Sequence, residues 1–196
     1  NNLLANNDIS SCKSVDSADG VIIYSGEREK ASQFIKDWCR KNPSDSLIIC
    51  DPFFGPEELE FLKIINSELP ECFVQIITGS KHQEQINIKK PYSEAFSSFW
   101  RLNISDVSPP ITDIILLKIS DSNDFPIHDR WIIGNNSGLR LGTSLNSIGL
   151  EKLTEISVLD KQRCSELGIY LQKFTNRILR EYNNKRIEYT TFTLTS

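Results

Sequence analysis

Short apolar runs alternate with amphipathic helical segments along most of this chain, and this alternation restricts its fold more than any other feature. Two of the runs, 21–24 and 47–50, have the length of strands that are buried on both sides. Between them, residues 27–41 carry apolar side chains at helical spacing, and Asn42-Pro43 ends that segment. Strands that alternate with helices predict a mixed α/β sheet with helices on both of its faces.

The same pattern continues towards the C-terminus. A further helix is expected to begin at Pro56 and to end at Leu69, because Pro70 follows. The remaining expected elements are a strand over 73–78, a polar loop over 79–91, a helix over 92–102, strands over 113–119 and 155–160, a helix over 163–183 and an edge strand over 187–194.

The length of the chain limits how many domains it can form. With 196 residues, of which 39% are hydrophobic, it is long enough to bury one sizeable core. We therefore expect one domain over residues 21–196. Residues 1–20 are rich in Asn, Ser and Asp without periodicity, and we expect them to form a linker or a loose arm.

Four polar residues on two neighbouring β-prone segments form the most informative motif. His128 and Arg130 are two positions apart in an extended segment, so their side chains share one face. The turn-rich residues 135–138 predict a hairpin whose returning arm carries Ser144 and Asn146, which again share a face. An imidazole, a guanidinium, a hydroxyl and an amide that converge in this way suit an anionic phosphorus centre better than a carbonyl. The sequence therefore predicts a phosphate site.

This motif resembles the signature of the phospholipase D superfamily, which is His-x-Lys, then Asp after four more residues, then a Gly-Ser-x-Asn segment. Arg130 stands at the position of the lysine, and Asn135 stands at the position of the aspartate. The last element reads Thr143-Ser144-Leu145-Asn146 here. Glu155 matches an acidic residue that opens the next strand in the family, and the segments before the motif resemble its β-α-β lead-in.

The resemblance implies a phospholipase D-like fold and the hydrolysis or transfer of a phosphodiester through a covalent phosphohistidine. In this interpretation His128 is the nucleophile, Arg130 holds the phosphate together with Ser144 and Asn146, and Glu155 orients His128 through its other ring nitrogen. A neutral imidazole is a competent nucleophile near pH 7, and a fixed positive charge offsets the charge that builds up on the phosphoryl oxygens. The resemblance implies no metal and no cofactor.

The chain contains only one such motif, whereas the chemistry needs two histidines. The other histidine, His82, follows a strand, has no second motif around it and is expected to lie on a surface loop. Members of the family with a single motif form symmetric homodimers that bring two motifs to one axis. We therefore expect a homodimer in which His128 of each copy faces the other.

Net charge and cysteine content limit which partners and which cellular compartment are expected. The net charge of −4 provides no overall basic field, so a nucleic acid would have to bind in a local groove. The five cysteines are scattered without a Cys-x-x-Cys pair, no apolar run is long enough to span a bilayer, and there is no signal-peptide pattern. We expect a cytoplasmic protein that does not bind membranes. Because the chain lacks methionine altogether, we expect it to derive from a longer protein with further domains upstream.

These observations favour a metal-independent nuclease that cleaves DNA or RNA. A lipid phosphodiesterase is less favoured, because no amphipathic basic helix indicates membrane binding. One alternative is a catalytically inactive phosphate-binding or dimerisation module, in which Arg130 and Asn135 mark the loss of activity. A third is a regulatory assembly domain of a larger defence or repair protein.

Overall fold

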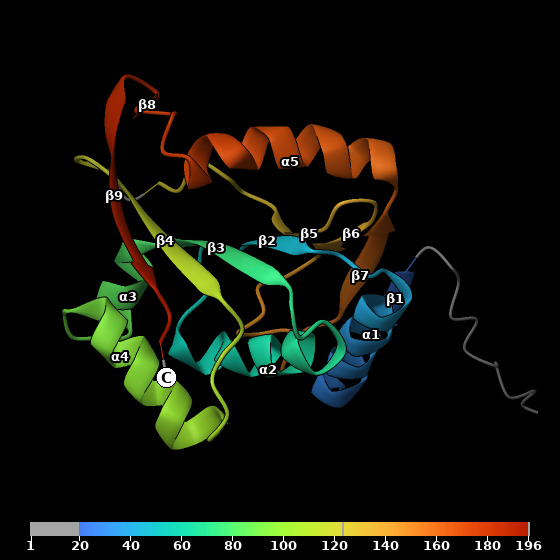
Figure 1. Cartoon of the computed structure of the whole chain (residues 1–196). Helices are drawn as coiled ribbons and strands as arrows, with labels where there is room; N and C mark the ends of the chain where they lie inside the picture. Colours follow the sequence, from blue (N-terminus) through green and yellow to red (C-terminus); the bar gives the residue numbers. More distant parts are fainter. Residues whose placement is uncertain (1–19, 123, 196) are drawn as a thin grey trace, which may run out of the picture.

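The computed structural model describes residues 20–122 and 124–195, and within these ranges one mixed sheet of nine strands forms the centre of the molecule (Figure 1). The expected arm over 1–20 lies outside the described residues, except that Gly20 already belongs to the first strand. The strands are β1 (Gly20–Ile23), β2 (Ser46–Cys50), β3 (Phe73–Gly79), β4 (Thr112–Ile119), β5 (Arg130–Ile133), β6 (Gly138–Leu141), β7 (Thr154–Leu159), β8 (Glu181–Tyr182) and β9 (Lys185–Thr193).

The order of the strands across the sheet is β1-β7-β6-β5-β2-β3-β4-β9-β8. Strands β2, β3 and β4 run parallel to one another, and every other neighbouring pair is antiparallel. Antiparallel neighbours need only short turns, whereas each parallel connection crosses over through helical structure. The sheet is therefore mixed, as the sequence predicts.

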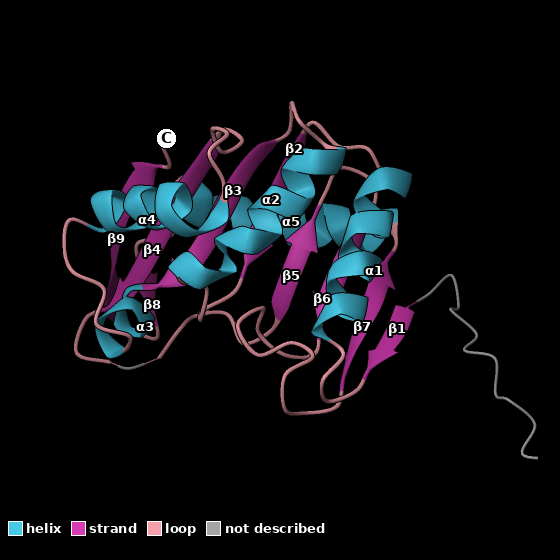
Figure 2. Cartoon of the chain, turned by 90° about the horizontal axis from the view of Figure 1, so that it is seen from below, coloured by secondary structure: helices cyan, strands magenta, loops and turns pink. Residues whose placement is uncertain are grey.

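Helices cover both faces of this sheet, which confirms the expected arrangement (Figures 1 and 2). Helices α1 (Arg28–Lys41), α2 (Leu59–Glu68) and α4 (Tyr92–Phe99) lie on one face, and α5 (Lys161–Thr175) lies alone on the other. A 3-10 turn, η1 (Pro56–Glu58), leads into α2, a short helix α3 (Ser80–Gln85) follows β3, and a π-helical turn, η2 (Trp100–Ile104), extends α4. None of the helices within the described ranges is long and apolar enough to cross a membrane.

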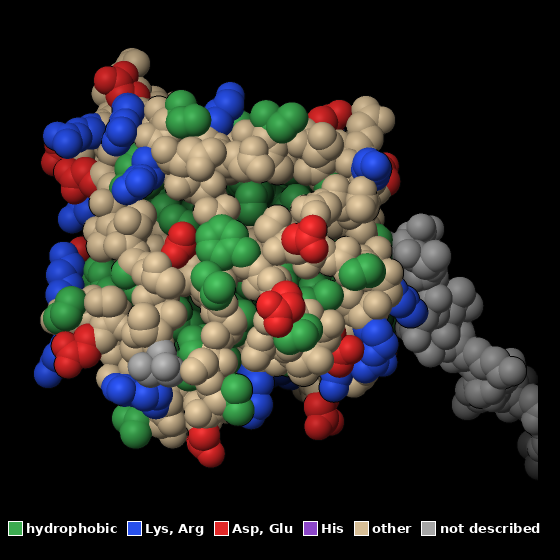
Figure 3. Space-filling view, viewed as in Figure 1, with side chains coloured by type: hydrophobic (Ala, Val, Ile, Leu, Met, Phe, Trp, Pro, Cys, Tyr) green, Lys and Arg blue, Asp and Glu red, His purple; other side chains and the backbone are tan. Residues whose placement is uncertain are grey.

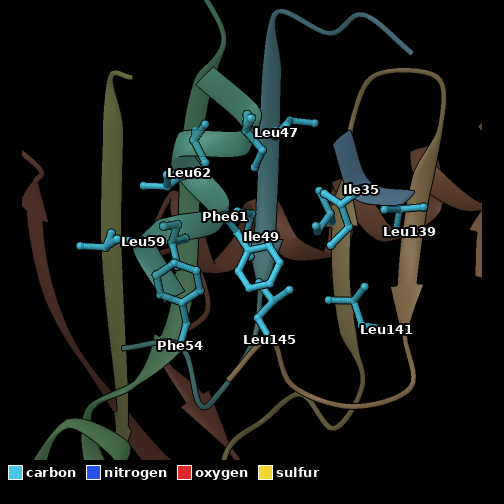
Figure 4. Packing of buried hydrophobic residues seen from close by; sticks show 14 of the residues in the cluster. Ile35, Leu47, Ile49, Phe54, Leu59, Phe61, Leu62, Leu139, Leu141 and Leu145 are labelled. Carbon is cyan, nitrogen blue, oxygen red and sulfur yellow. The ribbon is translucent and has the colours of Figure 1, made fainter. Parts of the chain in front are cut away.

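Alternate residues of the central strands supply two apolar layers, one on each face. Ile49 of β2 packs in the layer that includes α1 and α2, whereas its neighbour Cys50 packs towards α5. Figure 4 shows Leu145, from the segment after β6, in the first layer beside Leu141 and the side chains of α2. Because the buried Leu145 is adjacent to Ser144, the core holds the predicted phosphate segment in place.

Strands β5 and β6 form the predicted hairpin, in which Arg130 pairs with Leu141 and Ile133 pairs with Gly138. Two other expectations were wrong. Part of the segment 79–91 is helical rather than a loop, since α3 continues directly from β3. Helix α5 ends at Thr175 instead of 183, because Arg177 has a left-handed backbone with φ of 55°, which cannot continue a helix.

Candidate active site

His128, Arg130 and the segment that carries Ser144 lie at one edge of the sheet because of the directions of the strands. Strands β2 and β3 end there at Cys50 and Gly79, and β4 ends there at Ile119. Strand β5 runs antiparallel to β2, so it starts at this same edge with Arg130. Figure 2 shows the start of β5 and helix α3 at the same edge. The segments that carry Asp51, His82 and His128 are therefore close to one another.

Arg130 and Ser144 are in direct contact. The guanidinium Nε of Arg130 donates a hydrogen bond of 3.0 Å to Oγ of Ser144, which is almost fully buried. The guanidinium also lies over the ring of Phe53, with 5.6 Å between its carbon and the ring centroid. This hydrogen bond and the cation-π contact define the direction of the side chain, so the remaining donors of its planar fork are presented together.

Asp51 holds the segment that follows Ser144, a role that was not predicted from the sequence. Its carboxylate is completely buried, and it accepts a hydrogen bond of 2.7 Å from the backbone N–H of Leu145 and one of 3.0 Å from that of Phe53. Burial raises the pKa of Asp51, while these two bonds, the Ser144 hydroxyl and the charge of Arg130 act in the opposite direction. An aspartate directly after a buried strand is the signal that could have indicated this role.

His128 lies just before β5 and is almost fully exposed. Its side chain has a relative exposure of 94%, and its Nδ1 is 3.1 Å from Oδ1 of Asp129. The other oxygen of Asp129 forms an ion pair of 3.2 Å with Arg140 on β6. Within the described residues, Nε2 of His128 has no hydrogen-bond partner. This nitrogen is therefore available to a ligand, and Asp129 is positioned to hold the proton on Nδ1.

The structure does not bring Glu155 to His128 within the described chain. Glu155 lies on β7, two strands away from β5, and its Oε1 accepts a hydrogen bond from Oγ of Ser157. Its neighbour Ile156 is buried in the layer beside α1 and α2, so Glu155 points to the opposite face of the sheet. Asp129 occupies the place beside the imidazole that was expected for Glu155.

The two asparagines of the motif occupy different places. Asn146 is partly exposed and lies in the turn after Leu145, which Asp51 anchors. Asn135 lies beyond the other end of β5, where its backbone N–H donates to Oγ of Ser44, roughly 20 Å along the strand direction from His128. Asn135 therefore belongs to the support of the hairpin and not to the site.

His82 was expected on a surface loop, but it lies half-buried in α3 beside the site. Its ring is 5.5 Å from the ring of Phe53 and nearly perpendicular to it, at 80°. Burial lowers the pKa of His82, and the nearby charge of Asp51 acts against this effect. This position was not predicted, because the sequence pattern indicated a loop in place of the helix after β3.

A second buried carboxylate lies near this histidine. Oε2 of Glu58 accepts a hydrogen bond of 2.6 Å from the backbone N–H of Gly55. Desolvation by burial and, to a smaller extent, the charge of Asp51 raise the pKa of Glu58 to about 7, while the hydrogen bond from Gly55 acts in the opposite direction. A Cβ added to Gly55 would lie 3.3 Å from the same oxygen and 3.7 Å from Nε2 of His82, so the loop backbone passes close to both side chains.

An open cavity of about 480 Å³ lies next to the site, at the ends of β3 and β4. Phe53, whose ring contacts Arg130, also forms one wall of this cavity. Within residues 20–122 and 124–195, no group of three or more His, Cys, Asp or Glu side chains is placed to hold a metal ion. The guanidinium of Arg130 at this edge can bind an anionic oxygen.

Comparisons with known proteins identify the fold. The sequence matches no protein-family model and no curated protein. The structure, however, is similar to that of NucT from Helicobacter pylori, with a TM-score of 0.53 and 14% identity over 80% of this chain and 95% of NucT. It is also similar to phosphatidylserine synthase of Haemophilus influenzae, with a TM-score of 0.52 and 11% identity over 79% of this chain and 38% of that protein. These similarities confirm the expected phospholipase D-like fold.

Proposed function

We propose that this chain, which has the phospholipase D-like fold, is a metal-independent nuclease that cleaves phosphodiesters of DNA or RNA through His128. The observation that carries the proposal is the placement of three groups at one edge of the sheet. These are the exposed imidazole of His128, the guanidinium of Arg130 and the buried hydroxyl of Ser144, to which Arg130 is bonded. An exposed nucleophile and an oriented cation at the same edge of the sheet are suited to an anionic phosphorus centre.

The arrangement supports a two-step reaction. A proton on Nδ1 of His128, held by Asp129, leaves a lone pair on Nε2. Nε2 attacks phosphorus, so that a P–N bond forms and the P–O bond to the leaving group breaks, while a second imidazolium gives its proton to the leaving oxygen. A water molecule then attacks phosphorus and breaks the P–N bond, and the second imidazole accepts its proton. Arg130 offsets the charge on the non-bridging oxygens in both steps.

The second imidazole is proposed to come from another copy of the chain. The other histidine of this chain, His82, is half-buried behind Phe53, whereas His128 is exposed. A symmetric homodimer with the two His128 side chains on its axis would supply both groups.

The proposal of a nucleic acid as substrate rests on basic side chains along the same edge. Lys185 and Arg186 begin β9, which runs antiparallel to β4, so they lie at the edge where β4 ends. This position is four strands away from β5, or roughly 19 Å across the sheet. Figure 3 shows Lys and Arg side chains, with acidic ones between them, gathered over β8, β9 and the adjoining end of α5. A polyanion that extends over several phosphates can reach both places.

A phosphate-binding module without turnover is the second candidate. Arg130 favours it, because its Nε is already bonded to Ser144 and its guanidinium packs on Phe53. Binding of an oligonucleotide by the wild-type chain without any cleavage would support this alternative.

The test is cleavage of labelled single-stranded and double-stranded oligonucleotides in the presence of EDTA. The wild-type chain is expected to cleave at least one of them and to accumulate a phosphoramidate on His128 that mass spectrometry of acid-free digests detects. His128→Ala is expected to lose both signals while its circular dichroism spectrum stays unchanged. Cleavage that needs a divalent metal, or that survives this substitution, would contradict the proposed mechanism.

A further inference from the structure

The cavity beside Arg130 has a composition that distinguishes it from a phosphate site. It lies at the ends of β3 and β4, has a volume of about 480 Å³, and is open to solvent. Gly79 and Leu117 line its inner part, and Phe53 and Phe125 provide aromatic rings. Ligand sites of this size are commonly built from apolar and aromatic walls with a few polar groups.

Phe53 connects this cavity to the candidate active site. Phe53 is 39% exposed, and its ring lies against the guanidinium of Arg130 and nearly perpendicular to the ring of His82. Its backbone N–H donates to the buried carboxylate of Asp51, which defines where the ring can lie. A molecule that Arg130 holds by its phosphate is therefore within reach of the Phe53 ring, which forms one wall of the cavity.

The inner part of the cavity is closely packed. A Cβ added to Gly79 would lie 2.9 Å from the carbonyl oxygen of Pro52 and 3.6 Å from the ring of Phe125. The absence of a side chain at Gly79 thus lets the Phe125 ring lie against the end of β3. The two phenyl rings, from loops that follow β2 and β4, both face this cavity.

The rim carries both hydrogen-bond donors and acceptors, with an acidic excess. Lys118 forms an ion pair of 3.7 Å with Glu84, and Lys81 is the second cation of the rim. Asp121 and Asp124 add two further carboxylates. Such a rim disfavours a second phosphate, whereas it can accept hydrogen bonds from the amino groups of an uncharged heterocycle.

We propose that this cavity binds the nucleobase of the nucleotide whose phosphate lies at Arg130, with the Phe53 ring as its stacking surface. The proposal rests on the proposed function, since it takes phosphate binding at Arg130 as its starting point. Bases stack on aromatic side chains in many proteins that bind single strands, and loss of one stacking partner lowers affinity by roughly five- to hundredfold. The cavity would thereby select nucleotides over other phosphodiesters.

The experiment compares two ligands that differ only in the base. The His128→Ala chain, which cannot turn over substrate, is titrated with adenosine 5′-monophosphate and with ribose 5-phosphate, and the two dissociation constants are measured by calorimetry. The nucleotide is expected to bind at least fivefold more tightly. Phe53→Leu in the same background is expected to make the two dissociation constants equal. Phe53→Tyr is expected to keep the ratio between them.

Tyr170 provides a matched control on α5. Its side chain has the same exposure of 39%, it contacts Phe174 edge-on at 5.5 Å, and Lys173 lies 5.8 Å from its ring. Tyr170→Leu is therefore expected to leave the ratio of the two dissociation constants unchanged. Equal binding of the two ligands, binding of neither, or a ratio that survives Phe53→Leu would overturn the proposal.

The same titrations separate this proposal from the proposed function. Arg130→Gln is expected to weaken both ligands by a similar factor, because it removes the contact with their common phosphate. If Arg130→Gln changed neither dissociation constant and the nucleotide still bound more tightly than ribose 5-phosphate, the proposed phosphate site at Arg130 would be wrong. The proposed base site would then be supported independently of it.

Discussion

Nε of Arg130 and Oγ of Ser144 lie 3.0 Å apart, which ties the first residue of β5 to the segment that follows β6. Asp51 holds that segment in turn, through the backbone N–H of Leu145. A chain of contacts therefore runs from the buried end of β2 to the guanidinium of Arg130.

Replacement of Arg130 tests the role of its charge. Arg130→Gln is expected to lower kcat/KM for an oligonucleotide by roughly 100-fold or more, since removal of one preorganised group at a developing charge commonly costs that much. Arg130→Lys is expected to retain a substantial part of the activity, because it keeps the charge and loses the planar fork. Steady-state kinetics measure both, with the exposed Arg101→Gln as the control. Equal losses for Gln and Lys would contradict a role for the charge.

Asp51→Asn tests the support beneath the site. An asparagine offers one acceptor oxygen in place of two, so one of the backbone N–H groups of Phe53 and Leu145 loses its partner. The free energy of unfolding is expected to fall by about 1–3 kcal/mol, and kcat is expected to fall with it. Denaturant titration measures the first effect. Asp113→Asn, which alters a surface carboxylate bonded to Thr193, is the matched control and is expected to change both quantities little.

Asp129→Asn tests how His128 is held. The carboxylate of Asp129 lies beside Nδ1 and stabilises the imidazole with its proton on that nitrogen. The amide is expected to lower kcat, because it no longer holds the proton on Nδ1, while KM changes little. Steady-state kinetics measure both. A Glu155→Gln variant with larger effects would indicate that Glu155, which lies on the opposite face of the sheet, is the orienting group instead.

Glu58 makes stability depend on pH in a defined direction. Its pKa is about 7 in the folded chain against 4.5 as the ordinary value, so the folded state binds the proton more tightly. The contribution of this group to stability is therefore greatest below pH 4.5 and is lost as the pH rises to about 7, with a total change on the order of 3 kcal/mol. Glu58→Gln is expected to remove this dependence. Unfolding free energies of both chains between pH 4.5 and 8 measure it, and parallel curves would contradict the shifted pKa.

A mixing experiment tests the shared site. Wild-type and His128→Ala chains are unfolded together in equal amounts and refolded, so that random pairing leaves about one quarter of the dimers fully wild-type. If both His128 side chains are needed at one site, the activity is expected to fall to about one quarter of that of the same total amount of wild-type chain. Activity at about one half would indicate that each copy acts alone.

The local sequence pattern was sufficient to predict much of the architecture and one contact of the candidate site. Alternation of apolar residues predicted the strands, and the turn-rich residues 135–138 predicted the β5–β6 hairpin, which places Arg130 and Ser144 near each other over only 14 positions. The resemblance of the motif to the phospholipase D signature predicted the fold that the structural neighbours confirm. These features depend on residues that are close along the chain.

The supporting residues were decided by tertiary structure alone. Asp51 and Leu145 are 94 positions apart, and their hydrogen bond exists because β5 inserts next to β2 in the strand order. Glu155 faces away from Arg130 because of its register on β7, and His82 approaches Phe53 because α3 follows β3 directly. Periodicity reports which residues of one element share a face, but it carries no information on which elements become neighbours. Only the packing of the whole sheet determines that.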